Sequence, residues 1–139
     1  MGIIIDANAS HEFINQTEDG APVFNRVMTG KLKIVAGHQL KEELLKTAFR
    51  RLYKQLVLAG RLIEADNDEV DKEYKKNLLD CCVSNDRHVI ALARVSGARL
   101  LFSADEPLHA DFKNKTIIDN PRGKIYSSAK HEKILDGRV

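Results

Sequence analysis

The feature of this sequence that most constrains its fold is a run of three isoleucines at residues 3–5, followed directly by Asp6. β-Branched residues favour strands, and no polar residue alternates within the run, so we expect a strand that is buried on both faces. Such a strand lies inside a sheet that is covered on both sides. The acid that ends it, where glycine or asparagine is the usual turn residue, then needs an explanation of its own.

Further apolar runs predict more strands, at residues 32–36, 99–103 and 116–118, and a fifth after a Pro-Arg-Gly turn, at 124–127. Helical spacing of apolar residues and suitable end residues predict helices from about residue 9 and at 22–30, 40–58, 66–82 and 86–97. Strands that alternate with helices indicate a parallel sheet. The predicted fold class is therefore α/β, a three-layer α/β/α sandwich with a central, mainly parallel sheet of about five strands.

A chain of 139 residues that is 43% hydrophobic matches one domain with its own core. We expect that domain at residues 1–127 and a C-terminal tail at 128–139 that can be partly disordered. No apolar stretch approaches the roughly 18 residues that span a bilayer, and no leader is evident, so we expect a soluble, cytoplasmic protein without a membrane partner. The adjacent Cys81 and Cys82 suit a reducing compartment, because neighbouring cysteines rarely form an unstrained disulfide.

Acidic residues stand where the predicted strands end or the following helices begin. Asp6 ends the first strand, Asp105 follows the strand at 99–103, Asp86 falls in the first turn of a helix capped by Ser84, and a glutamate pair opens the helix at 40–58. Each position alone has an ordinary explanation as a turn or helix-start acid. Together they face the crevice at the carboxyl ends of a parallel sheet, where ligands bind. Carboxylates gathered there repel one another unless a hard cation such as Mg²⁺ or Mn²⁺ is bound.

Two points about this cluster remain to be settled from the sequence. Of the pair Glu42 and Glu43, we favour Glu43, because Glu42 stands four residues before Lys46 in the spacing of an exposed ion pair. The histidines are scattered without a metal-binding spacing. We expect them on the surface or at packed edges and not as metal ligands: His11, His38, His88, His109 and His131.

Three segments in order, IIIDANAS, QLKEELL and NDRHVIALARVSGARLLFSADE, resemble the PIN domain nucleases, and the resemblance extends over residues 3–112. It implies four catalytic, metal-binding acids and two supporting polar residues: Asp6, Glu43, Asp86 and Asp105, with Asn8 and Ser103. The family's last acid commonly lies in a short run that ends in phenylalanine. Here Phe112 comes later, which leaves open whether Glu106 or Asp111 assists Asp105.

The resemblance also implies an activity. PIN-like proteins hydrolyse phosphodiester bonds with Mg²⁺ or Mn²⁺, most often in single-stranded RNA, and many small ones are toxins paired with an antitoxin protein or form homodimers. The alternatives are an RNA-processing nuclease outside such a pair, or a non-catalytic module that binds RNA or protein. A receiver domain or a haloacid-dehalogenase-like phosphatase is disfavoured, because both want a second acid in the segment that here reads IIIDAN.

An RNA substrate also requires cations around the acidic site. The helix at 40–58 and the short segment after it are rich in cations, and further arginines are expected near the other side of the site. The expected rim consists of Lys41, Lys46, Arg50, Arg51, Lys54 and Arg61, with Arg87, Arg94 and Arg99 opposite.

Overall fold

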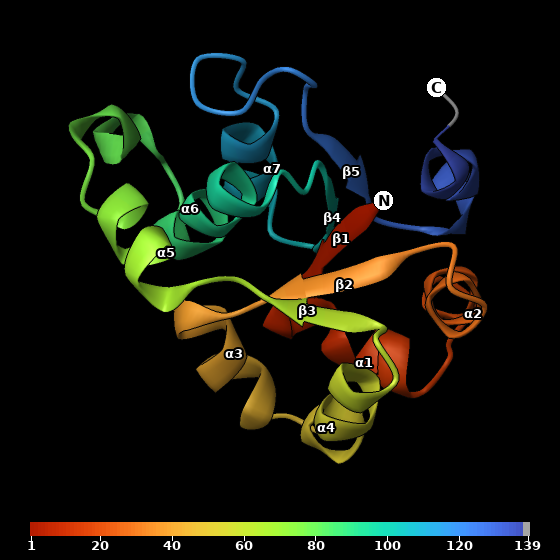
Figure 1. Ribbon diagram of the computed structural model, residues 1–139. Helices are drawn as coiled ribbons and strands as arrows, with labels where there is room; N and C mark the ends of the chain where they lie inside the picture. The colour runs from red at the N-terminus through yellow and green to blue at the C-terminus, as the bar shows by residue number, and fades with distance from the viewer. Residues whose placement is uncertain (138–139) are drawn as a thin grey trace.

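The computed structural model describes residues 1–137, and a sheet of five parallel strands runs through its centre (Figure 1). The strands follow the order β3-β2-β1-β4-β5 across the sheet. Their bounds are β1 (Gly2–Ile5), β2 (Lys33–Ala36), β3 (Leu62–Glu64), β4 (Leu100–Phe102) and β5 (Lys124–Tyr126). The predicted α/β class with a parallel sheet of about five strands is confirmed.

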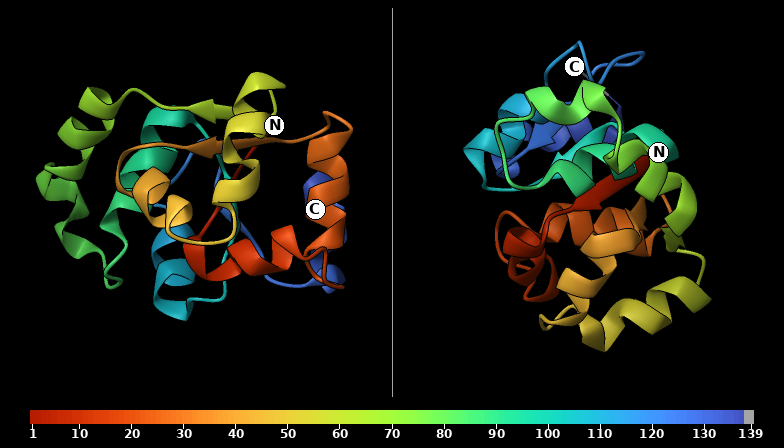
Figure 2. Two further views of the ribbon diagram at one scale, coloured as in Figure 1. Left: turned by 90° about the horizontal axis from the view of Figure 1, so that it is seen from below. Right: turned by 90° about the vertical axis from the view of Figure 1, so that its left-hand side faces the viewer.

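Helices cover both faces of the sheet, which makes the molecule a three-layer sandwich (Figure 2). One layer contains α1 (Ser10–Ile14), α2 (Ala21–Met28), α3 (His38–Leu45) and α4 (Arg50–Leu58). The other contains α5 (Asn67–Tyr74), α6 (Arg87–Ser96) and α7 (Glu106–Phe112). Short 3₁₀ turns are η1 (Ala7–Ala9), η2 (Asn77–Cys81) and η3 (Ala129–Asp136). Within residues 1–137 no helix has the length and apolar character needed to cross a membrane.

The strand order explains why the helices divide into two layers. From β1 the chain moves to β2 and then β3 on one side, and afterwards returns to β4 and β5 on the other side of β1. Because crossovers between parallel strands are right-handed, reversing the direction of travel moves the connecting helices to the opposite face. The reversal lies between β1 and β4, and an open α/β sheet binds its ligands in the crevice at that place, beyond the carboxyl ends of the strands.

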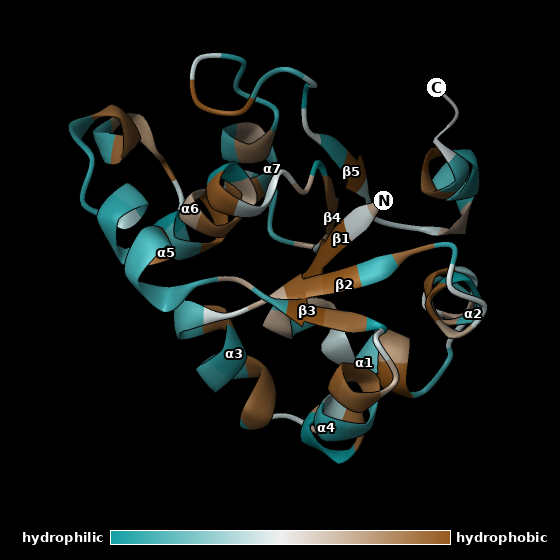
Figure 3. Ribbon diagram, in the orientation of Figure 1, coloured by the Kyte–Doolittle hydropathy of each residue, from teal (hydrophilic) through white to brown (hydrophobic). Residues whose placement is uncertain are grey.

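The central strand β1 is wholly buried at its three isoleucines, as the sequence predicted. Ile3, Ile4 and Ile5 have no exposed surface, and Ile3 is paired with Ile34 on one side and with Leu100 on the other. Figure 3 shows the apolar colouring concentrated on the strands and on the inner faces of the helices. After Ile5 the ladder continues for one more bond, in which the Asp6 backbone N–H donates to the Phe102 carbonyl at 3.0 Å.

Two of the strand predictions are wrong. The strand β3 was missed, and it forms an edge of the sheet where Ile63 is 49% exposed. Residues 116–118 were predicted as a strand but form a turn, in which the N–H groups of Ile117 and Ile118 both donate to the Asn114 carbonyl. Both isoleucines are buried, so their apolar character reflects burial of the turn and not a strand.

The helix predictions need three corrections. The helix expected at 40–58 is two helices, because the Thr47 hydroxyl donates to the Leu44 carbonyl at 2.7 Å and accepts from the Phe49 N–H at 3.1 Å, which turns the chain between α3 and α4. The helix expected at 66–82 is α5, which Asp66 caps, followed by the separate turn η2. The sequence prediction also missed α7, which has a proline in its first turn.

The C-terminal segment packs on the rest of the molecule as far as the structure describes it. Its turn η3 lies against α2, where the Arg26 Nε donates to Asp136 Oδ1 at 2.7 Å. Residues 138–139 of the predicted tail lie outside the described part of the chain.

The buried position of β1 gives a prediction about stability. We expect Ile4→Ala to lower the free energy of unfolding by about 3 kcal/mol, because it removes a side chain with no exposed surface and leaves a cavity. Ile63→Ala, an isoleucine of β3 that is half exposed, should cost less than about 1 kcal/mol. Urea denaturation measures both, and equal losses would contradict the assignment of β1 as the centre of the core.

Candidate metal centre

Asp6 directly follows the central strand β1 and is buried. It is 4% exposed, and both of its carboxylate oxygens accept hydrogen bonds. The Ala7 N–H donates to Oδ1 at 2.8 Å, and the Ser103 hydroxyl donates to Oδ2 at 2.9 Å. Burial raises the pKa of Asp6, and the charges of Glu43 and Asp105 contribute, although the two hydrogen bonds act in the opposite direction. The acid that ends β1 is thus a fixed carboxylate inside the crevice and not a turn residue facing solvent.

Ser103 connects the ends of β1 and β4. Besides donating to Asp6, its hydroxyl accepts the Asp105 backbone N–H at 3.0 Å, so one side chain sets the position of two acids. Asn8, in the turn η1 that follows β1, supports the same junction, because its Oδ1 accepts the Ala104 N–H at 3.3 Å. The two supporting polar residues named in the sequence analysis therefore lie beside these acids. Asp105 itself precedes α7, and its side chain makes no capping bond within residues 1–137.

Asp86 occupies the N-cap position of α6, which begins at Arg87 and not at Asp86 as predicted. Ser84 was predicted as the cap, but its hydroxyl instead accepts the Asp86 N–H at 3.3 Å. Among the described residues the Asp86 carboxylate makes no capping bond to the helix. The Asp86 carboxylate is consequently not used as a helix cap and can act together with the other acids as a ligand.

Asp111 holds the segment that leads to Asp86. It is 2% exposed, and its two oxygens accept the backbone N–H groups of Val83 and Ser84, each at 2.9 Å. Its role is therefore to anchor the loop before Asp86, and it does not belong to the acid cluster. Glu106, the other acid left open by the sequence, is an exposed residue in the first turn of α7.

The structure brings Asp6, Asp86 and Asp105 together. One carboxylate oxygen from each lies within 4.8 Å of the others. Partial burial raises the pKa of Asp86 to about 7, and its acidic neighbours, Asp6 foremost, add to the shift. Three oxygen donors at this spacing fit a small, hard divalent cation such as Mg²⁺ or Mn²⁺, which prefers carboxylate oxygen and relieves their repulsion.

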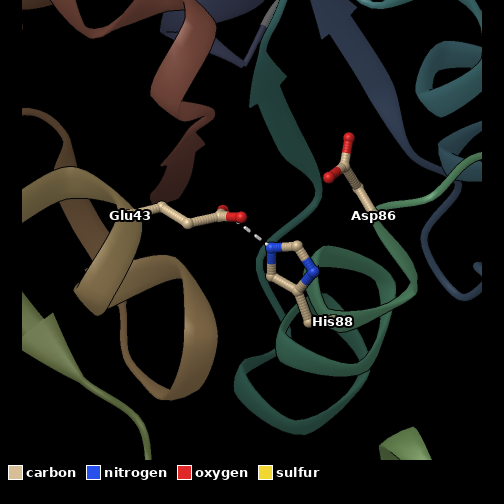
Figure 4. A group of neighbouring side chains, drawn as sticks. All are labelled: Glu43, Asp86 and His88. Atoms are coloured by element: carbon tan, nitrogen blue, oxygen red, sulfur yellow. Dashed lines mark hydrogen bonds and ion pairs between the residues drawn. The ribbon is translucent and has the colours of Figure 1, made fainter. Parts of the chain in front are cut away.

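Glu43 joins this cluster from α3, next to Asp86 (Figure 4). Gly37, at φ 137°, allows β2 to turn directly into α3, and an added Cβ there would come within 3.2 Å of the Ala65 backbone. Glu43, Asp86 and His88 form a second group whose donor atoms lie within 4.8 Å of one another. Glu42 is exposed and belongs to neither group, so the geometry favours Glu43, as the sequence analysis did.

His88 is the site residue that the sequence analysis missed. It was expected on the surface or at a packed edge, but it is 2% exposed and its Nε2 lies 2.9 Å from Glu43 Oε1. In an ideal helix, residues two apart point to roughly opposite faces, so periodicity gave no reason to pair His88 with Asp86. The pairing arises because Asp86 precedes the helix and has non-helical backbone angles.

Three of the six arginines predicted for the rim, Arg87, Arg94 and Arg99, have internal partners. Arg99 precedes β4 and thus lies at the amino ends of the strands, whereas the acids lie at the carboxyl ends. Its predicted position is therefore wrong. Arg87 donates to the Tyr74 and Lys76 carbonyls at 2.6 and 2.7 Å, and Arg94 pairs with Glu73 at 2.8 Å. Exposed cations on the α3–α4 side are Lys46, Arg50, Arg51 and Lys54. Lys46 lines a hollow of about 480 Å³ together with Glu43.

The sequence was also compared with protein families and with curated proteins. No protein-family model matches the sequence, and no curated protein is significantly similar to it. What the site does has to be inferred from its own side chains.

The crowding of acids gives a prediction about pH and stability. Because the pKa of Asp86 lies near 7 in the fold and at 3.8 ordinarily, this carboxyl favours folding below about pH 4 and loses that contribution as the pH rises through 7. In EDTA at pH 8, we expect Asp86→Asn to melt a few degrees higher than the wild type, about 3 °C. At pH 4 the difference should largely vanish. The exposed Asp119→Asn is the control, and calorimetry that finds no difference at pH 8 would contradict the crowding.

Proposed function

We propose that this protein is a Mg²⁺- or Mn²⁺-dependent endoribonuclease of the PIN-like type, which hydrolyses phosphodiester bonds in single-stranded RNA. The observation that carries the proposal is the meeting of Asp6, Asp86 and Asp105, from three separate segments, within 4.8 Å at the crevice of a parallel sheet. Isolated helix-start or turn acids have no reason to converge. Convergence with raised pKa values is the expected arrangement of carboxylates that hold a cation.

The chain's own residues account for most of what the reaction needs. Asp6, Asp86 and Asp105 would hold the ion, with Glu43 beside them, and Ser103 fixes two of these acids in place. A divalent cation bound there would activate a water molecule and stabilise the charge on the phosphate oxygens. The carboxylates would hold the ion and orient that water, and they would form no covalent intermediate. Such a site needs no other cofactor.

The surroundings of the site support a polyanionic substrate on one side. The exposed cations of α3 and α4 lie in the helix layer that carries Glu43, and Lys46 shares a hollow with it. Phosphate groups of a single strand would contact these side chains while one phosphodiester reaches the acids. RNA is the proposed substrate because PIN-like proteins act on it most often, and the cytoplasm is the proposed location.

For the biological role, we propose the toxin of a toxin–antitoxin pair. Its partners would be the RNA substrate, an antitoxin protein that covers the crevice, and a second copy of the chain in a homodimer. The support for this role is the resemblance of the three acidic segments to PIN domains. An RNA-processing nuclease outside such a pair has the same chemistry, and an experiment on growth distinguishes the two.

RNA cleavage by the purified protein tests the proposed nuclease activity. The purified protein should cut a fluorescently labelled, unstructured RNA in Mn²⁺ or Mg²⁺ and stop when EDTA is added. Asp6→Asn, Asp86→Asn and Asp105→Asn should each lower the rate at least about 100-fold, because removing a metal-holding charge forfeits several kcal/mol of transition-state stabilisation. Gel analysis of the products measures the rates.

Glu42→Gln is the matched control, because Glu42 adjoins Glu43 but lies outside both groups of donors. It should cut at the wild-type rate. Cleavage that persists in all three aspartate variants would indicate a contaminant or another site. Mn²⁺-dependent binding of RNA without any cutting would replace the proposal with a non-catalytic RNA-binding module.

The growth of a bacterial host tests the proposed toxin role. Induced synthesis of the wild-type chain in a bacterial host should halt growth and deplete intact RNA, whereas Asp86→Asn at the same protein level should be harmless. Growth should resume when the product of a neighbouring gene is supplied. Unimpaired growth with an enzyme that is active in the tube would favour an RNA-processing nuclease.

A further inference from the structure

His88 is a buried polar side chain on a helix that is otherwise apolar on its inner side. It is 2% exposed and is followed by five residues of α6 that are all buried and apolar, Val89, Ile90, Ala91, Leu92 and Ala93. Burying an imidazole without a hydrogen bond is unfavourable, and an apolar residue would fill the same space without that penalty. The hydrogen bond to Glu43 Oε1, 2.9 Å long, offsets the cost of burying His88.

Glu43 does not need this bond for its own solvation. Its side chain is 31% exposed, so water can reach the carboxylate, and Gln39 Nε2 lies 3.4 Å from the other oxygen, Oε2. What the bond changes is the freedom of the side chain. A glutamate at the edge of a helix samples several rotamers, and a partner on a different helix, 45 positions away in sequence, selects one of them.

The chosen rotamer points into the acid cluster. In Figure 4 the Glu43 carboxylate extends from α3 toward His88, with the Asp86 carboxylate across the same gap. An ionised carboxylate is an acceptor only, so Nε2 of His88 carries the hydrogen and is not available as a metal ligand. Glu43 Oε1 accepts this hydrogen and retains a second lone pair, as metal-binding carboxylates do when an outer residue orients them.

We propose that His88 is a positioning residue of the metal centre: it holds the Glu43 carboxylate beside Asp86, so that Glu43 is in place as the fourth acid before the cation binds. This inference rests on the proposed metal-dependent function. It assigns His88 no contact with substrate or metal.

The test is Mn²⁺ affinity, measured by titration calorimetry on the full chain. We expect His88→Leu to weaken binding about 10-fold, the usual effect of removing an orienting partner of a metal ligand. His88→Gln, whose amide can donate from a similar distance, should restore most of the affinity. Thermal melting in EDTA monitors folding. If His88→Leu melts too low to use, His88→Met, an adaptable apolar chain, takes its place.

A double-mutant cycle separates positioning from packing. Glu43→Gln should weaken Mn²⁺ binding by itself, and adding His88→Leu to it should cause little further loss, because the two residues act through one bond. Losses that multiply, or wild-type affinity in His88→Leu, would overturn the proposal. Nitrogen coupling from a histidine in the pulsed magnetic-resonance spectrum of bound Mn²⁺, lost in His88→Gln, would also overturn it by making His88 a direct ligand.

The outcome for His88 is separable from that for the function. If Asp6→Asn and Asp86→Asn keep full Mn²⁺ affinity, the metal centre and the nuclease proposal both fail. If they lose it and His88→Leu does not, only the role of His88 fails. If the wild type binds Mn²⁺ but cuts no RNA, the positioning role stands and the nuclease activity does not.

Discussion

The mutual repulsion of like charges in a partly buried crevice is the constraint on which the site depends. Asp6, Asp86 and Asp105 approach within 4.8 Å of one another, although burial raises the pKa of the first two and makes their charged forms unfavourable. The surrounding structure opposes this repulsion in each case. The central strand fixes Asp6, Ser103 fixes two acids at once, and Asp111 anchors the loop before Asp86. Such an arrangement sacrifices stability in the metal-free protein, a common property of functional sites.

The parts of the fold that the sequence predicted are those where burial determines residue type. The runs that became β1, β2 and β4 are continuous apolar segments because helices cover both faces of the sheet. The sequence predictions failed where residue type depends less on burial in the sheet. Strand β3 is short and lies at an edge, where its Ile63 faces solvent. The buried turn at 116–118 has apolar residues without being a strand, and the break at Thr47 depends on one side chain's hydrogen bonds.

The site was predictable to a similar extent and for a related reason. Topology places strand ends together, so Asp6 and Asp105 could be expected to meet once the sheet was known to be parallel. The choice of Glu43 over Glu42 followed from helical spacing. His88 could not be found in this way, because its relation to Asp86 depends on where α6 begins. The prediction of arginines at the rim was wrong for Arg94 and Arg99, because charge alone does not reveal that these side chains donate hydrogen bonds to backbone carbonyls inside the protein.

The bond between Ser103 and Asp6 joins residues that lie 97 positions apart in the sequence. Because translation proceeds from the N-terminus, Asp6 is made 97 residues before Ser103, and Asp105 and Asp111 follow later still. A ribosome-bound chain thus cannot complete the pocket until β4 has been inserted beside β1, and domains of this size fold as units. The order of synthesis thereby delays the gathering of the acids until β4 and the acid that follows it have been made.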